Sequence, residues 1–120
     1  MKGDNIVMAK KIVCLTGAGV SKESGIPTFE ETDIRKYLHR DYFIKHPEKF
    51  YNVILELQKN IRNAEPNAAH KALARYNIPI ITMNVDGLHH EAGSEKVIEI
   101  HGSLRQVYCN KCNIEYDFNY

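Results

Sequence analysis

Short apolar runs alternate with amphipathic stretches along this chain. Three runs, at residues 12–15, 78–82 and 97–100, have the length of strands, and the first predicts a strand buried on both faces. Between the first two, apolar residues recur with helical spacing over residues 46–64, and Pro66 starts a second helical stretch. We assign the longer helix to packing. Strands alternating with helices are typical of an α/β fold with an open parallel sheet.

The first apolar run ends at a polar, glycine-rich turn. Gly17 and Gly19 are expected to take backbone angles closed to other residues, and Ser21 is expected to cap a short helix. A strand, a glycine turn and a helix start bring backbone N–H groups up to a phosphate in many α/β proteins. The third glycine, Gly25, comes later than in the usual dinucleotide fingerprint, so the glycines alone are a weak signal.

Each of the three predicted strands ends in a polar cluster. These clusters are residues 17–21, the pair Asn84 and Asp86, and His101. In an open parallel sheet, ligands bind beyond the carboxyl ends of the strands. If the strands are parallel neighbours, the three clusters therefore form one site.

The polar residues at the later strand ends have more than one interpretation. Asn84 and Asp86 either orient a polar ligand or water, or cap a helix before a turn at Gly87. His101 precedes a glycine, where its side chain would be exposed beside a cleft. With an ordinary pKa near 6.5, an imidazole there could act as a general base.

Composition limits the kind of partner. The 120 residues fit one small domain, and 43% hydrophobic with 26% charged residues is ordinary for a globular protein. A net charge of +1 gives no electrostatic case for nucleic acid or an anionic membrane as the main partner. We find no apolar run of membrane-spanning length and no signal-peptide core, so the predicted location is cytoplasmic.

The remaining metal-binding and titratable residue types give weaker signals. Cys109 and Cys112 have the spacing of a zinc knuckle, but structural zinc needs four ligands. Either the other ligands lie beyond Tyr120, or the pair is a free dithiol. Cys14 is expected to be a small buried hydrophobe and His70 a structural histidine. Four histidines in polar surroundings are expected to be solvated: His39, His46, His89 and His90.

Two further segments are harder to assign. Residues 28–41 are charged and have no clean period, with a helical turn expected around residues 34–38. They either close over a ligand or form a solvated connector. At the N-terminus, residues 6–8 are expected to start a helical lead-in.

Taken together, these residues resemble the sirtuin family of NAD-dependent protein deacylases. The matching motifs are residues 17–29, residues 82–89 followed by Ala92 and Gly93, the pair His101 and Gly102, residues 66–70, and the two cysteines of the zinc knuckle. Their order and approximate spacing agree from about Val7 to Phe118. The resemblance implies a partial Rossmann-like parallel sheet with flanking helices over about residues 7–104. The start of a small zinc-binding module would follow over about residues 105–120.

The resemblance also implies site residues, NAD and zinc as cofactors, and an acyl-lysine protein as substrate. His101 would be the general base, with Asn84 and Asp86 as catalytic residues lining the nicotinamide pocket. Cys109 and Cys112 would be two of four zinc ligands. The implied cofactor-binding residues are Gly17, Ala18, Gly19, Ser21, Ile26, Pro27, Phe29, Met83, Asn84, Asp86 and His101. In such enzymes the acyl-lysine oxygen attacks the ribose carbon that loses nicotinamide, and the acyl group ends on ADP-ribose.

Three residues depart from the family pattern. Glu30 stands where many members have an arginine, and Met83 stands where a glutamine usually helps to hold the ribose. Branches that prefer negatively charged acyl groups carry a Tyr-x-x-Arg pair on the helix before residue 66. Here the counterpart is Tyr51 with Ile54, which favours neutral acyl groups such as acetyl.

The motifs stop at about half the length of a sirtuin catalytic core. The second cysteine pair, the later strands and the segments around the adenosine half of NAD are not among these residues. We therefore expect a truncated form, or one half of a protein whose C-terminal half is a separate partner. Two alternatives stay open: a related NAD-consuming hydrolase or ADP-ribosyltransferase, and a catalytically inactive nucleotide-binding remnant.

Overall fold

A three-stranded parallel sheet lies at the centre of the computed structural model, which describes residues 11–28 and 33–117. The strands are β1 (Cys14–Thr16), β2 (Ile80–Thr82) and β3 (Val97–Glu99), in the order β1-β2-β3. Leu15, Ile81 and Ile98 are aligned across the sheet. The predicted parallel neighbours are therefore confirmed. The lead-in expected at residues 6–8 lies outside the described residues.

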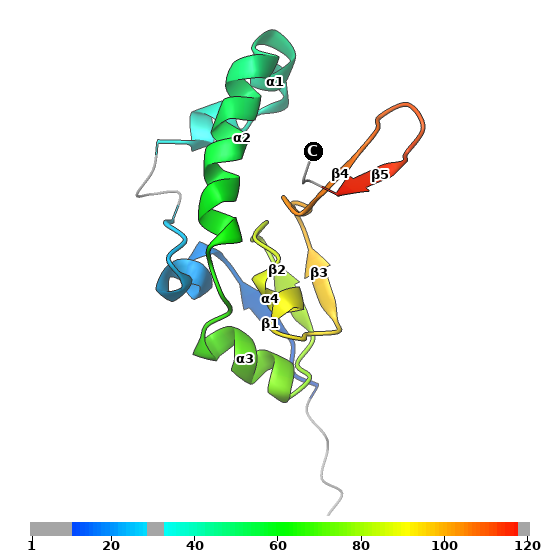
Figure 1. Cartoon of the computed structure of the whole chain (residues 1–120). Helices are drawn as coiled ribbons and strands as arrows, with labels where there is room; N and C mark the ends of the chain where they lie inside the picture. Colours follow the sequence, from blue (N-terminus) through cyan, green and yellow to red (C-terminus); the bar gives the residue numbers. More distant parts are fainter. Residues whose placement is uncertain (1–10, 29–32, 118–120) are drawn as a thin grey trace, which may run out of the picture.

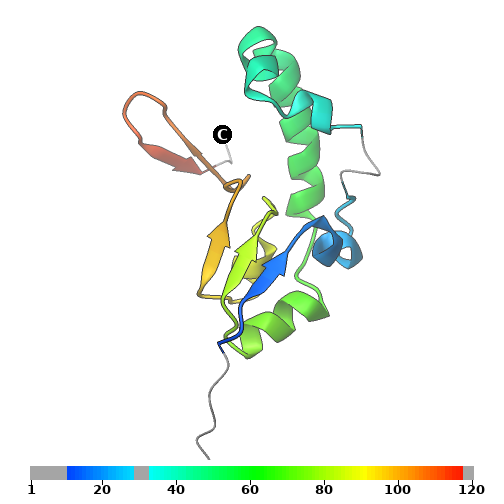
Figure 2. The same cartoon turned by 180° about the vertical axis from the view of Figure 1, so that it is seen from behind.

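Within the described residues, helices cover one face of this sheet only. Helix α4 (Leu88–Glu91) packs with α3 (Ala68–Arg75) on the covered side (Figure 1), where Ile80 and Leu88 are almost fully buried. On the opposite face, which Figure 2 shows from behind, Leu15 is 67% exposed. The expectation that the first strand is buried on both faces is wrong. Side chains alternate along a strand, and no element of the described ranges packs on the face that carries Leu15.

Two helices form an arm above the sheet. The predicted long helix is confirmed as α2 (Pro47–Arg62), which starts at its proline and is preceded by α1 (Arg40–Lys45). The rings of Phe43 and Phe50 pack at 5.0 Å between centroids and hold α1 on α2. Helix α1 has only six residues and no clear apolar period, so the sequence did not predict it. The turn expected near residue 36 is the 3₁₀ helix η2 (Arg35–Tyr37).

The glycine-rich turn forms a 3₁₀ helix, η1 (Ala18–Ser24). Its N-cap is Gly17, so the expectation that Ser21 caps a helix is wrong, because Ser21 lies in its middle and is buried. Gly17 has extended backbone angles that any residue adopts (φ −137°, ψ −169°), and Gly19 is not among the positive-φ residues. The predicted special angles belong instead to Gly25, which ends η1 in the left-handed region with φ +86°.

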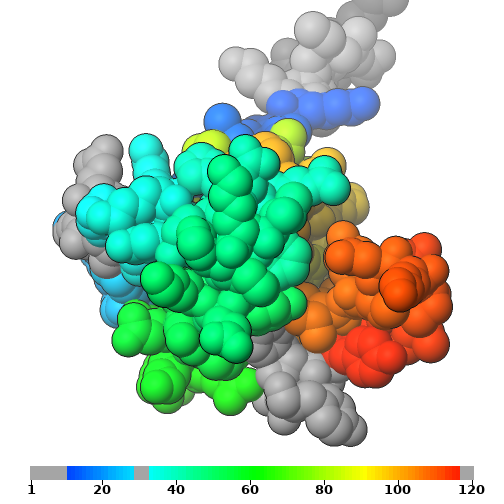
Figure 3. Space-filling view, turned by 90° about the horizontal axis from the view of Figure 1, so that it is seen from above, coloured from blue at the N-terminus to red at the C-terminus, as the bar shows by residue number. Residues whose placement is uncertain are grey.

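The C-terminal part is an antiparallel hairpin of β4 (Gln106–Tyr108) and β5 (Glu115–Asp117). Viewed from above, it forms a separate lobe (orange to red) beside the helical arm (Figure 3). The predicted boundary between the sheet and this module, near residue 104, stays a prediction. Of the helices in the described ranges, none has the length and apolar character needed to cross a membrane.

Candidate functional site

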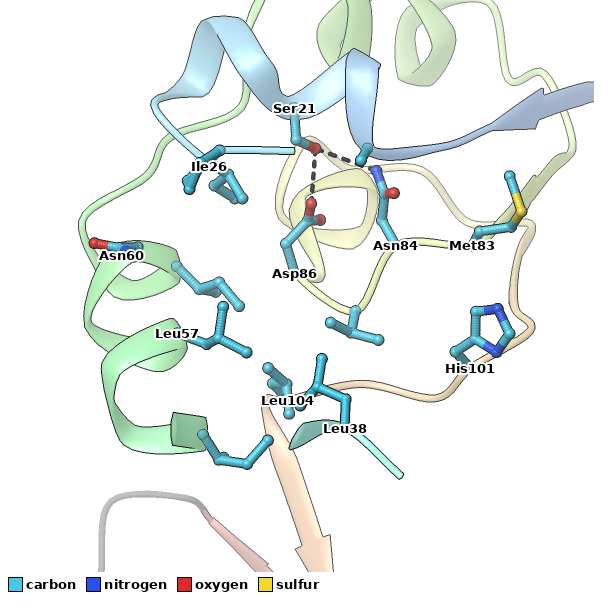
Figure 4. Close-up of a pocket in the computed structure, with 15 residues that line it drawn as sticks. Ser21, Ile26, Leu38, Leu57, Asn60, Met83, Asn84, Asp86, His101 and Leu104 are labelled. Atoms are coloured by element: carbon cyan, nitrogen blue, oxygen red, sulfur yellow. Dashed lines mark hydrogen bonds between the residues drawn. The ribbon is translucent and has the colours of Figure 1, made fainter. Parts of the chain in front are cut away.

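The carboxyl ends of the three strands open onto a cavity of about 430 Å³ between the sheet and helix α2 (Figure 4). Most of the residues implied by the resemblance gather there. Its lining comprises Ala18, Ser21, Ile26, Pro27, Leu38, Ile54, Leu57, Asn60, Ile61, Met83, Asn84, Val85, Asp86, His101 and Leu104. Gly17 and Gly19 do not line it, and Phe29 lies outside the described residues.

Ser21 is the centre of a hydrogen-bond network on one wall of the cavity. Its Oγ donates to Oδ2 of Asp86 at 2.7 Å and accepts from Nδ2 of Asn84 at 3.3 Å. The backbone N–H of Asn67 donates to Nδ1 of His70, so that ring carries its proton on Nε2 and donates to Ser21 Oγ at 3.3 Å. The hydroxyl of Ser21 thus accepts two hydrogen bonds and donates one, which leaves the buried group fully paired.

Asp86 and Asn84 are buried and held by their neighbours. The second carboxylate oxygen of Asp86 accepts the backbone N–H of Leu88 at 2.9 Å, and Asn84 donates to the carbonyl oxygen of Gly17 at 3.0 Å. The N-cap of α4 is Gly87 and carries no side-chain cap, so the interpretation as a helix cap is wrong for Asp86. Its carboxylate bonds a backbone N–H in the first turn of α4 and lines the cavity at the same time.

Two buried histidines lie behind this wall. His70 and His89 are 0% and 1% exposed, and their ring centroids are 4.8 Å apart. Burial lowers the pKa of each histidine, because desolvation disfavours the charged imidazolium. The structural assignment of His70 agrees with this position. The expectation that His89 is solvated is wrong, since α4 places it against the sheet, with Nε2 2.9 Å from Thr16 Oγ1.

His101 lies at the exposed edge of the cavity, as the sequence predicted. The backbone N–H of Ile100 donates to the carbonyl oxygen of Thr82, and that of Gly102 donates to Glu99, which fixes the turn around His101. In Figure 4 its ring lies on the same side of the cavity as Met83 and across from Leu57. The imidazole therefore borders the cavity while it stays accessible to water.

A second cavity of about 420 Å³ adjoins the first and shares several of its residues. Arg35, Leu38 and His39 contribute to its lining. The sequence predicted no site role for Arg35 or Leu38, and it predicted only that His39 is solvated. The apolar residues of this segment do not recur with a regular period, so the sequence does not show which of its side chains point inward. That part of residues 28–41 borders the cavities, which favours the ligand-covering interpretation of the segment over the solvated connector. Arg35 adds positive charge beside the glycine-rich turn.

Helix α2 forms the apolar wall. Ile54 and Ile61 are buried and line the first cavity together with Leu57. From the sequence we assigned this helix to packing. That assignment is correct for its apolar stripe, but it missed that the same stripe also lines the cavity. A helix stripe predicts burial, whereas which buried residues border a cavity depends on the element opposite.

The two hairpin cysteines do not complete a metal site by themselves. Over residues 11–28 and 33–117, no group of three or more His, Cys, Asp or Glu residues is placed to hold a metal ion. The backbone N–H of Lys111 donates to Sγ of Cys109 at 3.4 Å. Hydrogen bonds from the backbone of Lys111 and Cys112 lower the pKa of the Cys109 thiol. The turn thus favours a thiolate, and a four-ligand zinc site would need two donors from elsewhere.

Comparisons with known proteins show which curated proteins this chain resembles. The chain is 39% identical to a NAD-dependent protein deacetylase of Bacillus anthracis, over 93% of this chain and 52% of the relative. It is 43% identical to NAD-dependent protein deacylase 1 of Archaeoglobus fulgidus, over 93% and 51%. The chain thus spans about half the length of these curated relatives.

Solved structures of Sir2 proteins also resemble this chain, again over about half of their own length. A structure of Sir2 with a p53 peptide and NAD⁺ superposes with a TM-score of 0.83 at 41% identity, over 91% of this chain and 48% of that one. A Sir2 homologue in complex with NAD gives 0.79 at 43% identity, over 88% and 46%. The sequence model of the Sir2 family matches residues 17–120. With most of its length matched by that model, the chain belongs to the Sir2 family.

Proposed function

We propose that this chain builds the nicotinamide side of the site of a NAD-dependent protein-lysine deacylase. The observation that carries the proposal is the meeting of three strand ends at one cavity, with Ser21, Asp86 and Asn84 on one wall and His101 at the rim. The curated relatives named above carry the same activity in their names, which supports it further.

The cavity has the chemistry for a flat, partly polar ring. Its walls are mostly apolar, and the buried carboxylate of Asp86 and amide of Asn84 supply a few placed polar groups, as small-molecule sites usually do. We assign the carboxamide of nicotinamide to these two residues. NAD would supply a ribose carbon from which nicotinamide departs. The chain's own part is to hold the ring, exclude water with its apolar walls and provide a base.

His101 would be that base. It lies at the cavity rim with its ring accessible, and neutral imidazole is suited to accept a hydroxyl proton near pH 7. Ser21 is not assigned a proton-transfer role, because its hydrogen is already committed to Asp86 and its oxygen accepts two donors. It keeps the carboxylate in place.

The acyl group is proposed to be neutral. Ile54 occupies the position at which branches preferring acidic acyl groups carry an arginine, and it is buried at the cavity wall. An acidic acyl group would lose its hydration there without gaining a cationic partner from this residue. We therefore propose acetyl and other uncharged acyl-lysines in a protein as the substrate.

Zinc binding and location are proposals as well. We propose that Cys109 and Cys112 supply two thiolate ligands of a structural zinc, with the other two from outside the described residues; the lowered pKa of Cys109 supports this. A cytoplasmic location is proposed because free thiols persist in a reducing compartment. The net charge of +1 supports a protein substrate rather than nucleic acid or a membrane surface.

The test is an assay of an acetyl-lysine peptide with NAD, following nicotinamide release and acyl-ADP-ribose, on the chain and on His101→Ala. The expected result is coupled formation of both products, lost in His101→Ala and kept in the control His90→Ala, a neighbouring histidine outside the cavity lining. Nicotinamide release without peptide deacylation would favour the hydrolase. Folded protein with no turnover would favour the inactive nucleotide-binding remnant.

A further inference from the structure

Arg105 clamps the turn that carries Asp86. It lies between the sheet and the hairpin, and its Nε donates to the backbone carbonyl oxygen of Asp86 at 2.7 Å. Its terminal Nη2 donates to Oε2 of Glu91, on helix α4, at 2.6 Å. One guanidinium thus bridges Asp86, two residues before α4, and Glu91, the last residue of that helix.

The clamp packs directly on Gly87. This glycine has φ +70°, and a Cβ built on it would lie 2.5 Å from both Cδ and Nε of Arg105. A side chain at position 87 would therefore be strained by its backbone and would displace the arginine. The adjacent residue adds a second tie, because the backbone N–H of Leu104 donates to the carbonyl oxygen of Val85 at 2.9 Å.

Asp86 is consequently held from two sides. Its carboxylate is fixed by Ser21 and the N–H of Leu88, and its main-chain carbonyl is fixed by Arg105. We propose that Arg105 is a positioning residue for the nicotinamide pocket, which keeps the Asp86 carboxylate aimed at the ligand. Arg105 does not line the cavity, so it acts through Asp86 and touches no ligand. This inference rests on the proposed function.

Only an arginine side chain serves both partners in this geometry. A guanidinium presents donors in a planar fork, whereas the single ammonium of a lysine cannot reach a carbonyl and a carboxylate in the same arrangement. The pair with Glu91 is about two-fifths exposed on each side, so solvent weakens it. The bond to the Asp86 carbonyl is part-buried and is the one that matters for position.

The test compares four versions of the 120-residue chain: the natural sequence, Arg105→Gln, Arg105→Lys and a control, Arg75→Gln, which removes an arginine at the far end of α3. NAD and nicotinamide binding are measured by calorimetry, and the amide exchange of Gly87 and Leu88 is measured by NMR. Arg105→Gln is expected to weaken binding of both ligands about tenfold. It should also speed exchange at Gly87 and Leu88, while the melting temperature and far-UV spectrum stay close to those of Arg75→Gln.

The two readouts separate this inference from the proposed function. If the natural chain binds neither ligand, the proposed function fails, but faster exchange in Arg105→Gln would still establish the clamp. Unchanged exchange and unchanged ligand affinity in a folded Arg105→Gln would overturn the inference. Full retention of affinity by Arg105→Lys would equally contradict it, because the forked geometry would then be unnecessary.

Discussion

Ser21 and Asp86 are 65 positions apart in the chain, yet the hydroxyl of one donates a 2.7 Å hydrogen bond to the carboxylate of the other. This bond joins the 3₁₀ helix after the first strand to the loop after the second. It is buried, and both partners make further hydrogen bonds. Ser21 and Asp86 therefore form part of the cavity wall, whereas Gly17 and Gly19 do not line the cavity.

Replacing Ser21 by alanine should destabilise the fold. The change leaves Asp86 Oδ2 without its hydroxyl donor and removes the acceptor of His70 and Asn84, so a loss of about 2–3 kcal/mol of unfolding free energy is expected. Urea denaturation measures it. Ser94→Ala is the matched control, because Ser94 Oγ is buried without a partner among the described atoms and its removal should cost little. Equal losses in the two variants would contradict the role of Ser21.

Acidification should weaken the fold through the buried histidines. Burial lowers the pKa of His70 and His89 below 6.5, so the unfolded chain takes up protons before the folded chain does. The contribution of the two neutral histidines to the unfolding free energy is therefore fully present above pH 6.5. It falls as the pH drops from 6.5 toward the pKa values of the folded state. Unfolding free energies measured between pH 7.5 and 5 should show this decline.

A double variant tests the source of this pH dependence. His70→Asn with His89→Asn should be less stable at pH 7.5, because it loses packing and hydrogen bonds, but should show a shallower decline toward pH 5. If the slope is the same as in the natural chain, other groups account for the acid sensitivity.

Met83→Gln should strengthen NAD binding. Met83 borders both cavities and is 46% exposed, at the position where the family usually has a ribose-holding glutamine. One added hydrogen bond predicts an affinity gain of about fivefold, measured by calorimetry. Met83→Leu, which keeps the apolar character, should leave the affinity near that of the natural chain. A gain of the same size in Met83→Leu would point to packing instead.

Cys109 should be alkylated faster than Cys14. Its pKa is lowered by hydrogen bonds from the backbone of Lys111 and Cys112 and from the Cys112 thiol, and the thiolate is the reactive form. Iodoacetamide labelling at pH 7, followed by mass spectrometry, measures the two rates. Cys112→Ala removes only the side-chain contribution and should slow Cys109 in part. Saturating zinc should protect Cys109 if the proposed thiolate ligation occurs.

Leu15→Thr together with Ile98→Thr should be tolerated by the fold. Both side chains project from the open face of the sheet and are more than three-fifths exposed, so the change in stability should stay within about 0.5 kcal/mol per site. Binding of a hydrophobic dye and aggregation on heating should both decrease. A large loss of stability would show that this face is packed in solution.

Local patterns in the sequence predicted the long helix and the three strands of the parallel sheet, but not α1 or the hairpin of β4 and β5. The apolar stripe with Pro47 predicted α2, and the three apolar runs predicted strands whose polar ends meet, because periodicity and helix-start chemistry act within a few residues. The motif resemblance then implied the roles of Asn84, Asp86 and His101. The structure places all three at one cavity, and the catalytic roles themselves stay proposals.

Tertiary structure decided what those local patterns could not. Ser21 serves as a buried hub rather than a cap, His89 is buried rather than solvated, and Leu15 is exposed rather than enclosed. Each outcome depends on what packs opposite the residue, often many positions away, and no local period records that partner. The Arg105 clamp on Asp86 belongs to the same class, since its contact exists only once the hairpin segment returns across the turn before α4. The sequence determines which residues are available for the site, and long-range packing determines how they are held.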